Sequence, residues 1–344
     1  MLFKYLWRMI LITGSTGLVG THLLAKLLAV KPPEILRPLF RDEQKKAYSL
    51  LIIKQVYGEE IYQKATLCEW AKGDILDIPR MSDLFEGISY VYHCAGFISN
   101  SPSDRSLLRK INVEGTKNIV NLALDFKVKK LLHVSSIATL GKPKSGNHIN
   151  ENHHKESLQN VSYYSLAKYG AEMEVWRASQ EGLPMVIVNP GVILGEGFYT
   201  SGSGRIFEQA FNNLPFYLPK VTGFTTVKNL SNAMHELMES EIVNDRFIVV
   251  DANENFGKVQ KQIAKALNKK IPKFKLQKWL LHLFWLIELV LSPFRKRNLT
   301  WDVIDGMLVS KVYETTKIKN KIGFREEDIP IHIEEISKHY LQNV

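Results

Sequence analysis

The segment Thr13-Gly14-Ser15-Thr16-Gly17-Leu18-Val19-Gly20 decides the fold of this chain of 344 residues. It follows an apolar run at 9–13 and opens a run with helical spacing at 18–30. Gly14 permits a tight turn, Gly17 lets the backbone approach a pyrophosphate, and Gly20 lets the helix pack closely on the strand. The helix N-terminus then offers free N–H groups and a partial positive charge to an anion. The segment predicts a phosphate-binding turn, with the spacing G-x-x-G-x-x-G instead of G-x-G-x-x-G.

Short β-rich runs alternate with helical runs along the first 250 residues. The expected strands are 9–13, 35–40, 66–72, 90–93, 130–135, 185–189 and 246–250. The expected helices include 18–30, 107–126 and 165–180. This alternation predicts an α/β fold, a doubly wound parallel sheet of the Rossmann type with helices on both faces.

The pattern changes after Pro190, where glycine, proline and aromatic residues dominate. We therefore expect two domains. Residues 1–190, with about 225–251, form the dinucleotide-binding domain, and 191–224 with 252–344 form a smaller, mostly helical substrate-binding lobe.

The composition supports a large core and excludes a disordered chain, since 45% of the residues are hydrophobic. The two cysteines, Cys68 and Cys94, have no metal-ligand spacing, and His153-His154 lacks a third ligand nearby, so no metal site is expected. The apolar and basic start of the chain, residues 1–9, is followed by no cleavage pattern of a signal peptide. The expected location is the cytoplasm.

The net charge of +10 lies in one segment. Between residues 256 and 297 the sequence has eleven lysines and arginines and a single acid, Glu288. A nucleic-acid partner is therefore not expected, because the rest of the chain is neutral. The apolar run 279–291 is about 20 Å long as a helix, too short for a hydrocarbon layer of about 30 Å. With its basic flanks it predicts either peripheral contact with an anionic membrane through residues 258–297 or a core helix of the substrate lobe.

The end of the second strand, Leu36-Arg37-Pro38-Leu39-Phe40-Arg41-Asp42, bears on the choice of cofactor. An acid at this place binds the ribose hydroxyls of NAD, and an arginine suits the extra phosphate of NADP. Arg37 and Arg41 favour NADP, while Asp42 keeps NAD open.

Tyr164 and Lys168 lie four residues apart on one face of an expected helix. A phenol is a poor base at neutral pH, and a neighbouring ammonium lowers its pKa, which suits proton transfer. Ser135 and Ser136 end the fifth expected strand, where a hydroxyl points into the ligand crevice of a parallel sheet. These residues predict an acid–base site for a carbonyl or alcohol.

Further motifs complete an ordered series. They are Gly73-Asp74-Ile75, His93-Cys94-Ala95-Gly96, Asn112-Val113-Glu114-Gly115-Thr116 and Asn189-Pro190-Gly191. Together with the glycine turn, the paired serines and Tyr164/Lys168, the series resembles the extended short-chain dehydrogenase/reductase family, also called the NAD-dependent epimerase/dehydratase superfamily, over residues 9–250.

The resemblance implies a role for each matching position. Ser136, chosen over Ser135 because Gly141 lies five residues on, polarises the carbonyl, Tyr164 exchanges the proton and Lys168 holds the nicotinamide ribose. Asn112 is expected to brace the central strands. The expected cofactor-binding residues are Gly14, Ser15, Thr16, Gly17, Leu18, Val19, Gly20, Arg41, Asp74, Ile75, Ala95, Gly96, Asn112, Ser135, Tyr164, Lys168, Asn189, Pro190 and Gly191, for NADP or NAD with NADP favoured.

Two branches of this family compete. Many nucleotide-sugar epimerases and dehydratases carry R-x-F-x-x-V-x-D, where this chain reads Thr222-Gly223-Phe224-Thr225-Thr226-Val227-Lys228-Asn229. The arginine that clamps a diphosphate is absent, although Arg205 or Lys220 can replace it, and Asn189-Pro190 stands where many epimerases have Arg-Pro.

These departures favour the branch that resembles dihydroflavonol reductases and 3β-hydroxysteroid dehydrogenases, which act on apolar substrates. The aromatic residues of the lobe agree, namely Phe198, Tyr199, Phe207, Phe211, Phe216 and Tyr217. An epimerase or dehydratase with bound NAD is the alternative, and a non-catalytic cofactor-binding scaffold is a third reading. Besides a small-molecule substrate, a second copy of the chain in a homodimer is the other partner considered.

Overall fold

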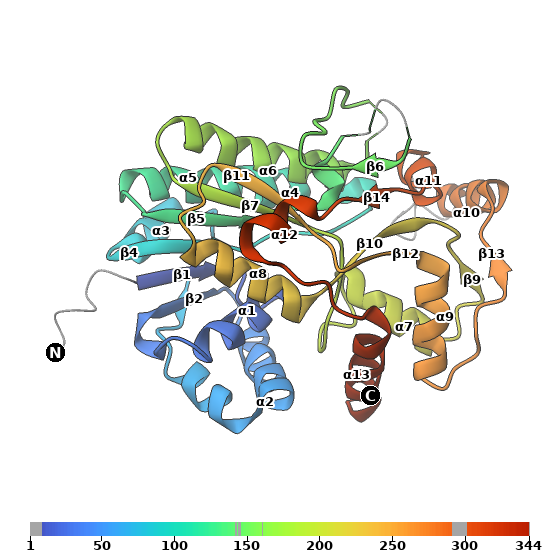
Figure 1. Ribbon diagram of the computed structural model, residues 1–344, viewed down its shortest axis with the longest axis horizontal. Coiled ribbons are helices and arrows are strands. Elements are labelled where there is room, and N and C mark those ends of the chain that lie inside the picture. The colour runs from blue at the N-terminus through green and yellow to red at the C-terminus, as the bar shows by residue number, and fades with distance from the viewer. Residues whose placement is uncertain (1–8, 142, 144–145, 160, 291–300, 344) are drawn as a thin grey trace.

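A computed structural model describes residues 9–141, 143, 146–159, 161–290 and 301–343 (Figure 1). Its centre is a sheet of seven parallel strands in the order β11-β7-β5-β4-β1-β2-β3. The strands are β1 (Met9–Thr13), β2 (Leu36–Phe40), β3 (Ala71–Lys72), β4 (Ile88–His93), β5 (Lys130–Val134), β7 (Met185–Pro190) and β11 (Asp245–Val249). The predicted doubly wound α/β fold is confirmed. The strand order reverses between β1 and β4, so the crevice at their carboxyl ends is the place for a ligand.

Alternate residues of the strands supply two separate cores. Ile10 and Ile12 face one side with α1 (Leu18–Leu28), α2 (Glu43–Thr66) and α8 (Val227–Glu239), whereas Leu11 faces the side of α3 (Ile78–Phe85), α5 (Gly115–Asp125) and α6 (Tyr163–Gln180). Figure 1 shows α5 and α6 above the sheet and α1, α2 and α8 below it. This division follows from the two-residue period of a strand buried on both faces.

Three elements differ from the sequence-based expectation. The strand expected at 66–72 shrinks to β3, because Thr66 ends the 24-residue helix α2, which starts at an Asp42 cap and bends at Gly58. The spacing of apolar residues in the sequence did not reveal α2, because few residues of this helix are buried. The helix expected at 107–126 is interrupted, with α4 (Arg105–Leu108) and α5 joined by the π-helical turn Arg109–Glu114.

A second lobe follows β7. Its small sheet has β8 (Val192–Leu194), β10 (Val221–Thr226) and β12 (Ala252–Asn255), covered by α7 (Arg205–Phe211), α9 (Phe256–Ala266) and α13 (Ile329–Gln342). Beyond them lie β9 (Phe216–Tyr217), β13 (Phe274–Lys275), α10 (Lys278–Val290) and α11 (Trp301–Met307). The aromatic residues Tyr199 and Phe207 are buried in this lobe, so they form its core and not a substrate wall.

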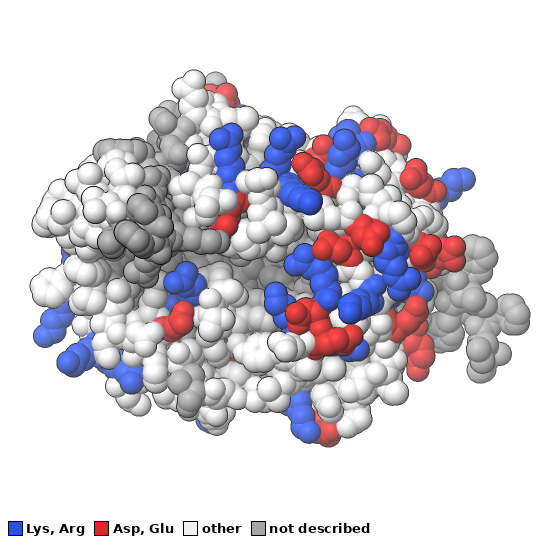
Figure 2. Space-filling view, turned by 180° about the vertical axis from the view of Figure 1, so that it is seen from behind, with Lys and Arg blue, Asp and Glu red and all other residues white. Residues whose placement is uncertain are grey.

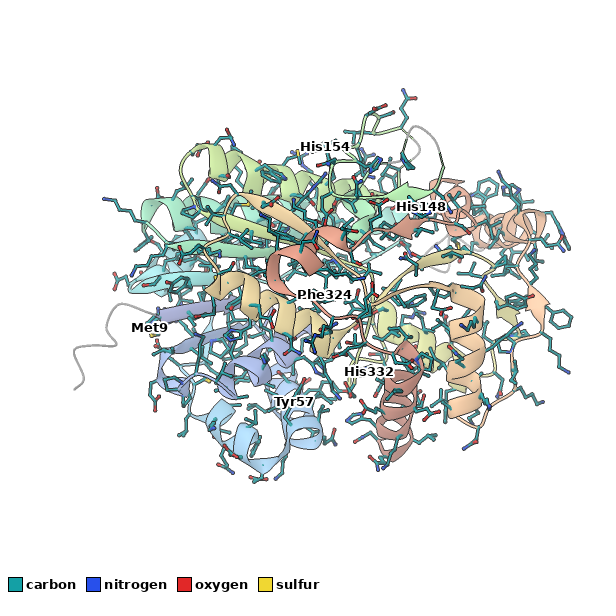
Figure 3. The ribbon with its side chains drawn as sticks, viewed as in Figure 1. Met9, Tyr57, His148, His154, Phe324 and His332 are labelled. Carbon is teal, nitrogen blue, oxygen red and sulfur yellow. The ribbon has the colours of Figure 1, made fainter. Side chains whose placement is uncertain are left out.

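The C-terminal part of the chain does not stay in the second lobe. β14 (Val312–Tyr313) pairs with β6 (His148–Ile149), and α12 (Thr316–Ile322) packs on α8 and β11. Ile318 and Phe324 are buried in the core below the main sheet, and Figure 3 shows Phe324 beside α8. Residues 312–324 therefore belong physically to the first domain, although the expected boundaries gave them to the lobe.

No helix among the described residues is long and apolar enough to cross a membrane.

Candidate active site

The glycine turn links β1 to α1. Gly14 has a φ of +68°, and a Cβ there would lie 2.6 Å from the Ala95 backbone nitrogen, so the turn touches the segment that follows β4. A Cβ at Gly20 would lie 2.2 Å from the Gly14 carbonyl oxygen, whereas a Cβ at Gly17 would meet only that oxygen, at 3.5 Å. The open side of Gly17 is where a ligand can approach the backbone.

The N-terminus of α1 differs from those of several other helices in having no side-chain cap. Side chains cap α2, α6, α8 and α9, but α1 has no side-chain cap at Gly17 and no acid in its first turn. Free N–H groups at such an end bind phosphate. Thr16, Leu18 and Val19 are half-buried beside it, while Ser15 is fully buried and donates to the Leu39 carbonyl at 2.5 Å. Ser15 thus offers a phosphate its backbone only.

The two arginines of β2 have different surroundings. Arg37 donates to Glu69, Leu84 and Glu86, so its guanidinium braces the fold and cannot reach a cofactor. Arg41 lies just beyond the end of β2, is exposed, and forms an ion pair with Asp74 at 3.1 Å. The expectation from sequence that both arginines favour NADP is wrong for Arg37.

Asp42 and Ile75 are also fixed by the fold. The Asp42 carboxylate accepts from the Lys45 backbone N–H at 2.9 Å and so caps α2. Ile75 is buried, and its side chain fills the space where a Cβ of Gly115 would lie.

The segment after β4 is held from two sides. The buried His93 ring bonds Thr13 at 2.7 Å and Thr116 at 2.9 Å, and burial lowers its pKa to about 3. Asn112 accepts from the Phe97 N–H and donates to the Phe97 carbonyl, both at 2.9 Å. Asn112 therefore braces the loop after β4, and not the strands as expected. This loop brings Ala95 and Gly96 to the glycine turn and to Lys168, since a Cβ at Gly96 would lie 3.8 Å from Lys168 Nζ.

Ser136, Tyr164 and Lys168 meet at the carboxyl end of β5. Burial raises the pKa of Tyr164 above its ordinary value of 10.0, and a hydrogen bond with Ser136 opposes the shift. Lys168 is buried and donates to the Val134 carbonyl at 2.6 Å, while burial lowers its pKa to about 8 against the attraction of Glu172. The direction for Tyr164 is opposite to the expectation from sequence, because burial dominates and the Lys168 ammonium donates to the Val134 carbonyl. The phenol therefore starts as a proton donor.

Behind these residues lies a polar network that the sequence analysis missed. The Glu172 carboxylate is fully buried and accepts from Ser135 at 2.6 Å, Thr139 at 2.7 Å and Asn189 at 3.0 Å. Its other oxygen pairs with the buried Arg246 at 3.0 Å. Glu172 lies two helical turns beyond Tyr164, a spacing that places both on one face of α6 and was the signal available in the sequence.

This network and the neighbouring strands hold four of the expected cofactor-binding residues. Ser135 and Asn189 turn their side chains to Glu172, and Asn189 also donates to the Ser136 carbonyl at 3.1 Å. Pro190 is the buried end of β7, and the Gly191 N–H donates to Val249 and Thr225. The three residues 189–191 join the two sheets, so their contribution to a ligand site is backbone shape.

The histidines of the loop before α6 serve the same network. His153 accepts from the Asn150 N–H at 3.0 Å, and His154 Nδ1 lies 3.4 Å from the Arg246 guanidinium. Burial lowers the pKa of His154. Within the described part of the chain, no group of three or more histidines, cysteines and acids can hold a metal ion.

A sheet with this reversal, an open and uncapped phosphate-binding turn and a Ser–Tyr–Lys set define a dinucleotide-dependent oxidoreductase fold. The chain belongs to the NAD-dependent epimerase/dehydratase family, whose model matches residues 10–217. It is an NAD(P)-dependent enzyme of the extended short-chain dehydrogenase/reductase type.

Relatives and solved structures agree with this assignment. A Synechocystis sp. protein provisionally named dihydroflavonol 4-reductase is 24% identical over 96% of this chain and 94% of its own. Sterol demethylase protein B of Methylococcus capsulatus is 26% identical over 72% of this chain and 71% of its own. A UDP-glucuronic acid 4-epimerase of Bacillus cereus, solved with UDP-glucuronic acid and NAD, has the same fold, with a TM-score of 0.74 at 17% identity over 98% of this chain and 100% of its own.

Removing the buried charge of Lys168 should separate function from stability. Lys168→Met is expected to lose turnover by orders of magnitude, yet to unfold no more easily at pH 7 without cofactor, because a desolvated ammonium is replaced by an apolar chain. Above about pH 8 the folded wild type releases this proton, while the unfolded chain keeps it up to the ordinary pKa of 10.5. Wild-type stability should therefore rise relative to the variant between these pH values. Urea unfolding of both proteins between pH 8 and 10.5 tests this prediction, with Lys117→Met at an exposed lysine as control. A difference in unfolding free energy between wild type and Lys168→Met that stays constant with pH contradicts it.

Breaking the Glu172–Arg246 pair should be costly. Glu172→Gln leaves the Arg246 guanidinium buried without its counter-charge and is expected to lower the free energy of unfolding by about 3–5 kcal/mol. Replacing both residues by Met removes both charges and should cost less than the sum of the two single changes. The control is Glu181→Gln at the exposed Arg177 pair, with an expected loss below about 1 kcal/mol. Additive losses in urea unfolding contradict the coupling.

Proposed function

We propose that the protein is a reductase that transfers a hydride from NADPH to the carbonyl of a small apolar substrate, or runs the reverse oxidation of the alcohol. The observation that carries the proposal is the meeting of Ser136, Tyr164 and Lys168 at the carboxyl end of β5, where burial keeps the phenol protonated. A hydroxyl pair of this kind matches a carbonyl oxygen that gains negative charge.

Each residue of the set has a distinct task. Ser136 donates to the carbonyl oxygen and polarises it, and Tyr164 gives the proton that the developing alkoxide needs. Lys168, held by the Val134 carbonyl and facing Gly96, is placed to bind the ribose hydroxyls and to keep positive charge near the phenol. The nicotinamide cofactor supplies the hydride when bound.

The missing diphosphate clamp supports a reductase over a sugar epimerase. Asn229, at the position of the family's acid, is buried and donates to Asp251 and to the Arg325 carbonyl, so it braces the lobe. Arg205 pairs with Glu208 on its own helix at 3.8 Å. Lys220 is half-buried against Phe256, and burial with Lys311 nearby lowers its pKa to about 8.

The names of the relatives include both reductases and sugar epimerases. Relatives over most of the chain include a protein named for dihydroflavonol reduction and a UDP-glucose 4-epimerase of Vibrio cholerae. An epimerase with tightly bound NAD is the second candidate, favoured by the solved epimerase structures and by Lys220 as a residual cation.

The residues at the end of β2 support NADP. Arg41 is exposed at the strand end, and Asp42, the acid that would bind ribose hydroxyls, is engaged as the cap of α2. The ion pair of Arg41 with Asp74 is exposed and therefore weak, so a phosphate can take its place.

Arg41→Ala should reveal the cofactor preference. It is expected to lower kcat/KM for NADPH about 10–100-fold through loss of a charge-assisted contact, and to leave NADH nearly unchanged. The control is Arg109→Ala, an exposed arginine in an ion pair with Glu114 on the helical turn that follows α4. Equal effects on both cofactors, or none, contradict the NADP assignment.

Cofactor stoichiometry separates the two candidate reactions. A panel of aromatic aldehydes, ketones and UDP- or dTDP-sugars should show net NADPH consumption with a carbonyl substrate and none with the sugars. Tyr164→Phe should reduce kcat at least about 10²-fold, the usual size of general acid catalysis, and still bind NADPH. Sugar turnover without net consumption would establish the epimerase, and full activity of Tyr164→Phe would exclude its acid role.

A further inference from the structure

The helix α10 presents apolar side chains on its outer side. Trp279 is 62% exposed, Leu283 43%, Leu286 49% and Val290 75%, and their spacing forms one stripe along the helix. Ile287 extends the stripe at 46%. A continuous apolar stripe of this kind on one helix marks an interaction site, in contrast to scattered exposed residues.

The inner side of the same helix is already used. Leu281 is buried with Leu276 and Ile304, and Phe284 and Trp285 pack against them. The helix is therefore apolar on both sides, and the described part of its own lobe packs against only one of them. The outer stripe is not needed for the core.

Basic residues precede the stripe along the chain. From 256 to 290 the sequence has eight lysines and a single acid, Glu288. Lys273 and Lys275 are exposed before the helix and Lys278 at its first position. The exposed side chains of Ile271 and Phe274 continue the apolar surface there. Strand β13, which carries Phe274, pairs with β9.

A basic groove adjoins this surface. Lys258, Lys261 and Lys265 follow one side of α9 and line a groove of about 430 Å³ together with Tyr217 and Ile271. Figure 1 shows α9, β13 and α10 together at one end of the molecule. Figure 2, seen from behind, shows white surface at that end, with blue side chains along its lower edge.

We propose that this surface, Ile271, Phe274 and the outer stripe of α10 with the lysines of α9 and of the segment before the stripe, docks the enzyme on an anionic membrane. The helix lies in the headgroup region, with Trp279 and its neighbours among the upper acyl chains. The lysines, whose long stems reach past apolar atoms, contact lipid phosphates. At about 20 Å the helix lies on the membrane and does not span it.

Charge argues against a second copy of the chain as the occupant. A symmetric contact would set the lysines of one copy opposite the same lysines of the other, a like-charge arrangement that costs binding energy. A surface of lipid phosphates has the complementary charge. The inference does not depend on which carbonyl compound the enzyme reduces.

The test is co-sedimentation of the full-length protein with vesicles. Binding is expected to phosphatidylcholine vesicles that contain phosphatidylglycerol at low salt. It should fall at least about tenfold in pure phosphatidylcholine, and also in about 1 M salt, where the Debye length is about 3 Å. Trp279→Gln/Leu286→Gln and Lys273→Gln/Lys275→Gln/Lys278→Gln should each weaken binding by a similar factor.

Matched variants make the result specific. Leu67→Gln/Ile331→Gln changes two other apolar side chains, 68% and 57% exposed, and should bind like the wild type. Lys117→Gln/Lys129→Gln/Lys338→Gln controls for charge alone, and unfolding midpoints verify that every variant is folded. Absence of binding to anionic vesicles at low salt overturns the proposal. The proposal is also overturned if the wild type has the molar mass of a dimer and Trp279→Gln/Leu286→Gln has that of a monomer. A second copy of the chain would then cover the stripe.

Discussion

The buried carboxylate of Glu172 is the constraint on which the site depends. It binds the segment after β5 through Ser135 and Thr139, the end of β7 through Asn189, and β11 through Arg246. Three parts of the chain that are distant from one another in sequence thereby take fixed positions around α6. Since α6 also carries Tyr164 and Lys168, and the bound segment carries Ser136, the network determines how these three side chains meet. A buried charge with every partner in place defines one arrangement, because any other leaves a group unpaired in the interior.

The same interior explains the protonation of the site. Lys168 has the backbone of Val134 as its hydrogen-bond acceptor, and burial outweighs the attraction of Glu172 on its pKa. Tyr164 is kept neutral by burial for the same reason. A proton donor held in a poorly solvated crevice is suited to a carbonyl that becomes an alkoxide, and this is the common basis of the reductase proposal and of the assignment of Ser136.

The two lobes differ in how completely they bury their apolar side chains. In the first domain, alternate strand residues enter one of two cores and almost no large apolar side chain of the sheet is left outside. The second lobe buries Tyr199 and Phe207 in a core of its own but leaves the outer stripe of α10 uncovered. The excess charge of the protein lies in the sequence segment 256–297, which contains that stripe, so the chemistry and the proposed docking surface belong to separate parts of the chain.

Much of the fold and the outline of the site were predictable from local sequence signals. The strand periods, the glycine turn between a strand and a helix, and the spacing of Tyr164 and Lys168 each depend on neighbours within a few residues. The helix α2 was not predictable, because it is mostly exposed and lacks a clear apolar period. Of the strand expected at 66–72, only β3 forms, since Thr66 ends α2 and a turn follows it.

The sequence by itself determined the order of the strands and helices, the phosphate-binding turn and the identity of the residues able to move a proton. Only the tertiary structure decided which of them face the crevice. Ser135 and Ser136 are adjacent and chemically alike, yet one is bound to Glu172 and the other to Tyr164, and Arg37 and Arg41 are separated in the same way. Such choices depend on partners 30 or more positions away, such as Glu172, Glu69 and Asp74, whose proximity arises only when the sheet assembles.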